Sequence, residues 1–261
     1  MRWGGFHLAR AQGEGRIVLG QSAAFTGPAA QLGVQFNQGA KLFFDQLNAQ
    51  GGVGKRTVEI RTLDDGYEPD RCAENTRKLI ADEVFALFGY IGTPTSLAAM
   101  PLFNQAKVPF FGPFTGAEAL RQPFNRLIFH VRASYYDETA LIVRQLTNLG
   151  LKKIAVFYQN DAYGKAGLDG VTKALTELQL TPVATATVER NSVDVKAAVD
   201  KLVPAMPDAI VQITAYASAA AFVRAARKAG FGGTFYNVSF VGTQALADEL
   251  GKDGAGVVVS Q

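Results

Sequence analysis

Two stretches of the chain share one order of local patterns: a hydrophobic strand, a loop of small hydroxyl residues, an amphipathic helix and a second strand. The first covers residues 85–112 and the second covers residues 208–236. In open parallel α/β sheets, ligands bind at the carboxyl ends of the strands, and both hydroxyl-rich loops fall at such ends. Two similar lobes facing each other would form a cleft.

Strand and helix patterns alternate from Arg16 onward, which predicts βαβ units and mostly parallel sheets. We therefore expect two Rossmann-like α/β lobes, over residues 14–132 and 133–250. The boundary is placed near Val131–Ser134, because Ser134 can cap the helix that follows. A chain of 261 residues with 48% hydrophobic content can build a core in each lobe.

The first 13 residues do not fit this alternation. Ala9-Arg10-Ala11 has the form of a signal-peptide cleavage site, but the hydrophobic stretch before it is short for a secretory signal. We interpret residues 1–13 as a signal-peptide remnant, the alternative being a leader without function. No apolar run approaches the ~18 residues of a membrane span.

Composition and motifs argue against several classes of function. The net charge of +3 is scattered without a run of Lys or Arg, unlike a nucleic-acid groove. Cys72 is the only cysteine, which rules out an internal disulfide and a multi-cysteine zinc site. Gly51–Lys55 lacks the residues of a phosphate loop and leads from a helix to a strand, the reverse of what phosphate binding needs. No G-x-G-x-x-G follows the first strand to seat a dinucleotide.

Candidate catalytic side chains are few. Asp64 and Asp65 end a strand, where successive side chains point to opposite sides, so we interpret them as turn and capping residues. His7 lies in the leader, and His130 lies in an apolar run where a packed role is the default. Without a nucleophile elbow or a second cysteine, no common hydrolytic site can be assembled. We predict a protein that is not an enzyme and uses no metal or cofactor.

Five loops at strand ends contain hydroxyl, amide or aromatic side chains. They are residues 21–33, 92–96, 114–116, 160–163 and 214–216. Any one alone is ordinary helix capping, but the helix dipole and unpaired N–H groups at such positions favour a negative charge. Together the loops predict a site for a carboxylate.

Several segments occur with a specific order and spacing: Ile17–Pro28, Gly33, Leu47–Val53, Asp64-Asp65, Gly92–Ser96, Pro113–Ala117, Tyr163-Gly164 and Arg224–Gly230. Together they resemble the leucine/isoleucine/valine-binding protein family, the type I periplasmic solute-binding proteins of ABC transporters. The resemblance runs from Gly15 to Gln261. It implies two α/β lobes, joined by three crossovers, that close on a small ligand.

The resemblance also implies ligand contacts. Thr93 matches a hydroxyl that binds the ligand carboxylate, Thr115 lies in the loop that holds the carboxylate and ammonium, and Tyr163 matches an aromatic lid. The full implied set is Phe25, Leu32, Gly92, Thr93, Phe114, Thr115, Gly116, Tyr163, Ala215, Tyr216 and Ser239.

Two departures from the family pattern affect this expectation. Ser239 stands where branched-chain amino-acid binders carry the acid that meets the ligand ammonium. Its hydroxyl favours a carboxylate without an amine, or an amide, and Asp161 is the alternative source of negative charge. The second departure is length: residues 251–261 resemble the start of a return crossover to the first lobe, whose C-terminal part is expected to be missing.

The sequence thus predicts a periplasmic, monomeric receptor that delivers a small carboxylate or amino-acid-like ligand to the permease of an ABC transporter. No nucleic-acid partner is expected. The alternative is a ligand-binding sensor or receptor ectodomain of the same fold. A repressor would need a helix-turn-helix ahead of Arg16, where the leader is too short, and an enzyme lacks a catalytic constellation.

Overall fold

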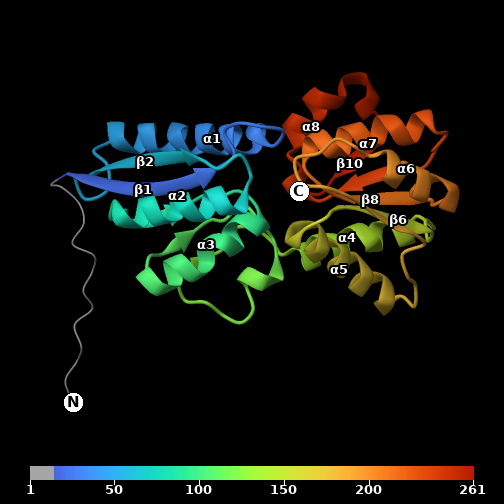
Figure 1. Cartoon of the computed structure of the whole chain (residues 1–261), viewed down its shortest axis with the longest axis horizontal. Coiled ribbons are helices and arrows are strands. Elements are labelled where there is room, and N and C mark those ends of the chain that lie inside the picture. Colours follow the sequence, from blue (N-terminus) through green and yellow to red (C-terminus); the bar gives the residue numbers. More distant parts are fainter. Residues whose placement is uncertain (1–14) are drawn as a thin grey trace, which may run out of the picture.

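The computed structural model describes residues 15–261 and shows two α/β lobes side by side (Figure 1). The leader expected over residues 1–13 lies outside the described part. Each lobe contains one five-stranded sheet in which every strand pair is parallel. The predicted fold class is confirmed.

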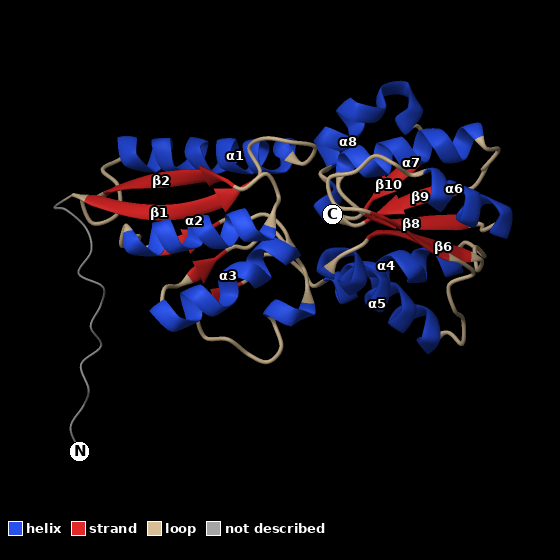
Figure 2. Ribbon diagram, viewed as in Figure 1, coloured by secondary structure: helices blue, strands red, loops and turns tan. Residues whose placement is uncertain are grey.

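The first lobe is built from elements that alternate along the chain, and its sheet has the order β2-β1-β3-β4-β5. The elements are β1 (Arg16–Ala23), α1 (Ala30–Ala49), β2 (Thr57–Asp64), α2 (Pro69–Ala81), β3 (Ala86–Phe88), α3 (Thr93–Ala106), β4 (Phe110–Phe111), the 3-10 turn η1 (Glu118–Leu120) and β5 (Ile128–Phe129). Helices α2 and α3 lie on one face of the sheet, and α1 lies on the other (Figure 2).

The second lobe follows the same plan with the sheet order β10-β9-β8-β6-β7. Its elements are α4 (Tyr135–Asn148), β6 (Ile154–Gln159), α5 (Ala162–Glu177), β7 (Thr185–Val188), α6 (Lys196–Leu202), η2 (Val203–Ala205), β8 (Ala209–Ile213), α7 (Tyr216–Lys228), β9 (Thr234–Asn237), η3 (Ser239–Val241), α8 (Thr243–Leu250), η4 (Gly251–Gly254) and β10 (Val257–Val259). Helices α4 and α5 pack together on one face, and α6 and α7 pack on the other.

The chain passes from the first sheet to the second lobe between β5 and α4. Ser134 caps α4: its hydroxyl accepts the Asp137 N–H, and the Asp137 carboxylate accepts the Ser134 N–H in return. This capping box satisfies two N–H groups that a helix start otherwise leaves unpaired. Helix α4 therefore begins at a defined residue just beyond the linking segment.

The end of the described chain corrects one expectation. Residues 251–261 were expected to begin a return toward the first lobe, but Val257–Val259 pairs in parallel with β9 as an edge strand of the second sheet. The Ser260 N–H continues the ladder by donating to Asn237 O at 2.9 Å. Three successive valines suit a strand with a free neighbour to pair with, and β9 offers that neighbour.

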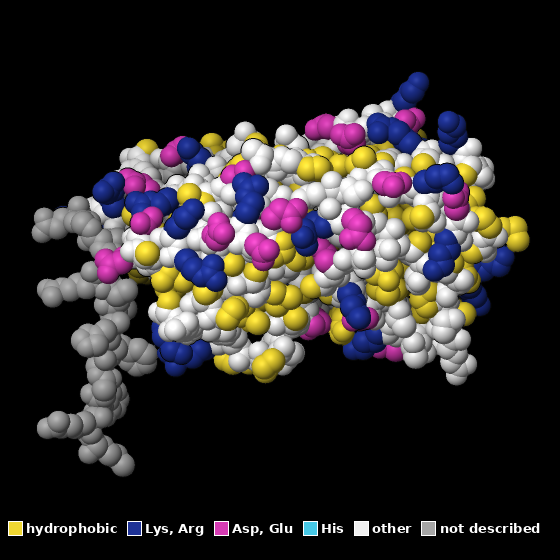
Figure 3. All heavy atoms as spheres, in the orientation of Figure 1, with side chains coloured by type: hydrophobic (Ala, Val, Ile, Leu, Met, Phe, Trp, Pro, Cys, Tyr) yellow, Lys and Arg dark blue, Asp and Glu magenta, His cyan; other side chains and the backbone are white. Residues whose placement is uncertain are grey.

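The surface carries charges of both signs. On the face drawn in Figure 3, lysine and arginine side chains are interspersed with aspartate and glutamate across both lobes. Within residues 15–261, no helix is both long and apolar enough to cross a membrane.

Candidate functional site

The start of α3 and the loop after β4 bring two threonines together between the lobes. Gly92 precedes α3 with a φ of 98°, which favours glycine, and a Cβ there would lie 2.2 Å from a ring atom of Tyr67. Thr93 follows, and its Oγ1 lies 2.5 Å from Oγ1 of Thr115. Each threonine is 1% exposed, so this hydroxyl pair is closed off from solvent.

Four aromatic side chains from both lobes lie around this pair, and we call them the aromatic cluster: Tyr67, Tyr135, Tyr163 and Phe240. The Phe240 ring centre is 4.4 Å from that of Tyr163 and 6.0 Å from that of Tyr67, and Tyr135 is 5.4 Å from Tyr163. All four are fully buried. Because Tyr67 belongs to the first lobe and Tyr163 and Phe240 to the second, the lobes are closed on each other here.

The cluster also makes polar contacts, one between the lobes and one within the second lobe. Gln159, at the end of β6, donates its side-chain N–H to the Tyr67 hydroxyl at 3.2 Å. The Tyr163 hydroxyl donates to the carbonyl of Thr214, at the end of β8, over 3.4 Å. Burial raises the pKa of Tyr67 and of Tyr163 well above the usual value, so both are neutral phenols.

Ser239 lies beside a buried carboxylate that the sequence did not place there. Glu138 accepts hydrogen bonds from the Ser239 N–H at 2.8 Å, the Ser239 hydroxyl at 2.9 Å and the Ser260 hydroxyl at 2.8 Å. Arg132 donates to the Ser239 hydroxyl and forms an ion pair with Glu138 at 3.8 Å. The expectation that this corner lacks a negative charge is therefore wrong, although Arg132 already neutralises that charge.

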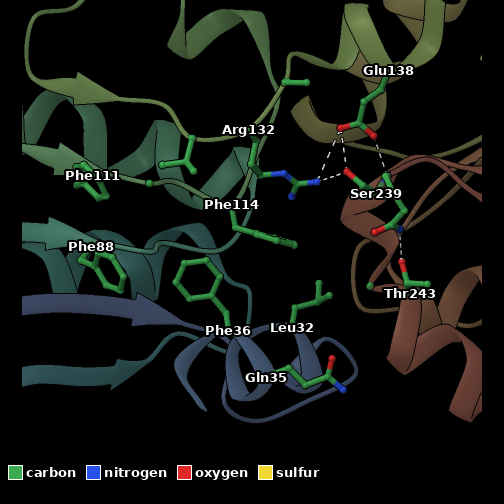
Figure 4. Close-up of a pocket in the computed structure, with 15 residues that line it drawn as sticks. Leu32, Gln35, Phe36, Phe88, Phe111, Phe114, Arg132, Glu138, Ser239 and Thr243 are labelled. Carbon is green, nitrogen blue, oxygen red and sulfur yellow. Dashed lines mark hydrogen bonds and ion pairs between the residues drawn. The ribbon is translucent and has the colours of Figure 1, made fainter. Parts of the chain in front are cut away.

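A pocket of about 730 Å³ opens next to this corner. In Figure 4, Phe36, Phe88 and Phe111 lie along one part of it, and Arg132, Glu138 and Ser239 lie across from them. The Arg132 guanidinium lies 4.0 Å from the centre of the Phe114 ring, a cation–π contact. The volume is within the ~300–1,000 Å³ of small-molecule sites. The lining combines four phenylalanines and smaller apolar residues with one charged corner.

Asp161, the other acid considered for the site, is occupied by structural bonds. As the N-cap of α5 it accepts the Tyr163 N–H at 2.9 Å and the Gln159 side-chain N–H at 2.6 Å. Arg190 pairs with it at 3.4 Å and also reaches Glu68 of the first lobe at 2.9 Å. Asp161 therefore shares Arg190 with Glu68, whereas Glu138 pairs with Arg132.

The structure brings most of the implied ligand contacts to one centre. Around the hydroxyl pair and the aromatic cluster lie Gly92, Thr93, Phe114, Thr115, Gly116, Tyr163 and Ser239, with Leu32 lining the adjoining pocket. Tyr216 instead joins the lobes at another point, where its hydroxyl accepts the Gln31 N–H at 3.3 Å. Ala215 precedes it as the N-cap of α7, and the Phe25 N–H donates to Asp64.

Sequence reasoning missed Tyr67, Arg132, Tyr135, Glu138, Gln159 and Phe240. Phe240 directly follows Ser239, and Tyr135 directly follows the predicted cap Ser134. The sequence analysis had therefore marked a neighbour of each of these two residues. Glu138 had no such signal, because the residue it binds lies 101 positions away.

The remaining candidates have structural roles. Asp64 caps the loop after β1 and Asp65 accepts the Ser22 hydroxyl at 2.6 Å, while the His130 ring contacts Leu120 O at 3.0 Å. Cys72 is buried, as expected, and burial raises its pKa. In the described part of the chain, no three His, Cys, Asp or Glu side chains are placed to hold a metal ion.

Comparison with known proteins agrees with this architecture. The family model described as "Periplasmic binding protein" matches residues 16–261. A possible leucine/isoleucine/valine-binding protein from Rhodopirellula baltica SH 1 is 37% identical with a TM-score of 0.91, covering 95% of this chain and 69% of that one. A substrate-binding periplasmic protein from Ralstonia solanacearum is 32% identical with a TM-score of 0.88, covering 92% of this chain and 69% of that one.

Curated relatives are more distant and longer. The Leu/Ile/Val-binding protein homolog 7 of Brucella abortus (strain 2308) is 26% identical over 226 residues, which is 82% of this chain and 56% of the relative. The chain thus spans little more than half of that relative's length. Family match, fold and cleft agree, and the chain belongs to the leucine/isoleucine/valine-binding protein family of type I periplasmic binding proteins, which bind solutes and are not enzymes.

Proposed function

We propose that this protein is the periplasmic solute receptor of an ABC transporter and binds a small carboxylate that lacks an ammonium group. The observation that carries the proposal is the buried Thr93–Thr115 hydroxyl pair, at two strand ends of the first lobe, with aromatic rings of both lobes packed against the adjoining Gly92, Phe114 and Gly116. Hydroxyl donors at strand ends suit a carboxylate, and aromatic walls suit an apolar body.

The charges around the cleft support the absence of an ammonium. A desolvated ammonium needs a negative partner, and both nearby acids, Glu138 and Asp161, are already paired with arginines. Releasing Glu138 would leave Arg132 without its carboxylate partner, and releasing Asp161 would leave Arg190 paired with Glu68 alone. A carboxylate does not require either ion pair to break, because the threonine hydroxyl groups can donate to it.

The contacts between the lobes support closure around the ligand. Leu32 and Phe114 of the first lobe lie with Ser239 and Gly242 of the second along one pocket. Opening would separate Gln159 from Tyr67 and expose the hydroxyl pair, and closing would remove water from it. The closed form is then the species that would present the ligand to a membrane permease.

The test is a ligand panel read by thermal shift and calorimetry on the full chain, with leucine, the keto acid of leucine and phenylacetate as probes. A ligand at a hundredfold excess over Kd stabilises the folded state by about 2.7 kcal/mol. We expect one or both acids to stabilise the protein and leucine to have little effect. Tight leucine binding, with both acids silent, would reject the ligand class.

A substitution locates the site. Thr115→Val keeps the volume and removes the hydroxyl, which should weaken binding of the acid by about 1–3 kcal/mol. Thr176→Val, on the exposed side of α5, is the matched control and should bind like the wild type. Equal affinity of the Thr115 variant and the control would remove Thr115 from the site.

A further inference from the structure

Tyr135 occupies the junction of the two lobes. It is the first residue of α4, and its N–H donates to Gly116 O at 2.7 Å. A Cβ at Gly116 would lie 2.8 Å from a ring carbon of Tyr135, so the ring packs directly on the loop that carries Thr115. On its other side the ring meets Tyr163 of the second lobe.

The Tyr135 hydroxyl is the exception among the fully buried tyrosines. The Tyr67 hydroxyl accepts from Gln159, Tyr90 bonds Thr76 at 3.0 Å, and Tyr163 donates to Thr214 O. Within residues 15–261, no group meets the Tyr135 hydroxyl with hydrogen-bond geometry, although the Thr115 hydroxyl lies close enough to act on its pKa. Buried polar groups normally have a partner, and leaving one without costs on the order of 1–3 kcal/mol.

The surroundings make this hydroxyl a donor. Burial raises the pKa of Tyr135 to about 12, with Arg132 and Thr115 acting in the opposite direction. A neutral phenol carries a proton that it can donate, and its bond to an ionised oxygen is roughly twice as strong as a bond between neutral groups.

We infer that Tyr135 is a ligand-contacting residue of this cleft, and that its hydroxyl donates a hydrogen bond to an anionic oxygen of the ligand beside the Thr93–Thr115 pair. This inference rests on the proposed function. It gives the ligand one donor from the start of α4, in addition to those of the first lobe. Because Tyr135 touches both lobes, a ligand bound to it favours the closed arrangement.

The experiment uses Tyr135→Phe, which keeps the ring and its packing and removes only the hydroxyl. Tyr90→Phe is the matched control, since it removes an equally buried hydroxyl from the first-lobe core, where Tyr90 packs on Phe110. Calorimetric titration compares phenylacetate with its amide, phenylacetamide, on the full chain. The amide offers a neutral oxygen in the same position.

We expect Tyr135→Phe to raise the Kd of phenylacetate about tenfold or more, because a hydrogen bond to a charged group is lost, and to raise that of the amide by a smaller factor. Tyr90→Phe should leave the ratio of the two Kd values unchanged. Wild-type affinity of Tyr135→Phe for phenylacetate would overturn the assignment. So would an equal loss for acid and amide, since packing alone would explain it.

The outcome separates this inference from the proposed function. If the wild type binds leucine and no acid, the proposed ligand class fails, and the same variant titrated with leucine decides whether Tyr135 meets a carboxylate oxygen. A leucine Kd that rises about tenfold in Tyr135→Phe would support the assignment. An unchanged leucine Kd would overturn it.

Discussion

The two lobes share one topology but bury their sheets to different extents. In the second lobe, every residue of β8 is buried, and Phe157 of β6 stacks on Phe222 of α7 with ring centres 4.0 Å apart. In the first lobe, the side chains facing α2 and α3 are buried, but the opposite row is not. Phe111 is 46% exposed and Phe129 is 49% exposed.

This difference follows from where the helices lie. Helix α1 packs against β2 at one side of the first sheet, and in residues 15–261 no second helix accompanies it over β4 and β5. Phe88, Phe111 and Phe129 therefore form a stacked row across three strands, with ring centres 6.3 and 6.1 Å apart. The same strand pattern thus gives a two-sided core in one lobe and a largely one-sided core in the other.

The largest expected effect tests the two cores directly. Phe222→Ala should lower the free energy of unfolding by about 3–5 kcal/mol, because it leaves a cavity in a closed core. Phe111→Ala should lower it by about 1 kcal/mol or less, because its side chain is already half in water. Urea denaturation followed by circular dichroism gives both values. Equal losses would show that the two faces are equally packed in solution.

A smaller effect is expected on the pH dependence of the free energy of unfolding, and it arises from Asp65 in the first lobe. Burial raises the pKa of Asp65 to about 6, from 3.8 for an ordinary Asp, although Ser22 and the Tyr67 N–H donate to it. Because the folded pKa is the higher one, this carboxyl favours folding most below pH ~4, and the contribution is lost as pH rises from about 4 to about 6. The free energy of unfolding should therefore fall by about 2 kcal/mol less between pH 4 and pH 6 in Asp65→Asn than in the wild type, as measured by unfolding at a series of pH values.

Asp64→Asn is the control for that measurement. Burial acts to raise the pKa of Asp64, but hydrogen bonds from Thr26, the Phe25 and Gly66 N–H groups and Arg71 lower it to about 2. Its folded pKa is below the unfolded value, so its contribution is present above pH ~4 and is lost as pH falls toward 2. The slope between pH 4 and 6 should therefore survive in Asp64→Asn. Parallel curves for the Asp65 variant and wild type would contradict the assignment.

The smallest effect concerns the contact that joins the unlike lobes. The Glu68 carboxylate of the first lobe accepts hydrogen bonds from two side chains of the second lobe, Arg190 at 2.9 Å and Asn191 at 2.7 Å. These side chains are partly exposed, so Glu68→Gln should weaken closure by less than about 1 kcal/mol, and less still at high salt. Energy transfer between a dye on each lobe, without ligand, measures the closed fraction.

Glu59→Gln, which removes an exposed pair with Arg16 inside the first lobe, is the matched control for closure. It should leave the transfer efficiency unchanged at every salt concentration. If both variants behave alike, Glu68 does not contribute to holding the lobes together.

Much of the fold was predictable because its signals are local. The Ser134 cap, the buried strand Ala209–Ile213 and the alternation of strands and helices depend on residues a few positions apart. The return segment was predicted wrongly because its pairing partner is not a local property. Three successive valines predict a strand, but the tertiary structure decides which strand it pairs with, and Val257–Val259 pairs with β9.

The site was predictable only in part. Strand-end position and family resemblance singled out Thr93, Thr115 and Tyr163 as candidate contacts, and these residues occupy strand and helix ends that recur in this architecture. No sequence pattern predicted that Arg132 and Glu138 form an ion pair or that both contact Ser239. These contacts depend on how α4 and η3 pack in the folded lobes.

The sequence by itself determined the two βαβ lobes, their order along the chain and the hydroxyl loops at the strand ends, since periodicity and capping act over a few residues. Only the tertiary structure decided which charges are neutralised, which phenol lacks a partner and which sheet face stays open. Those properties depend on contacts between residues as far apart as Glu138 and Ser239, and burial sets their strength by removing the water that would otherwise screen them.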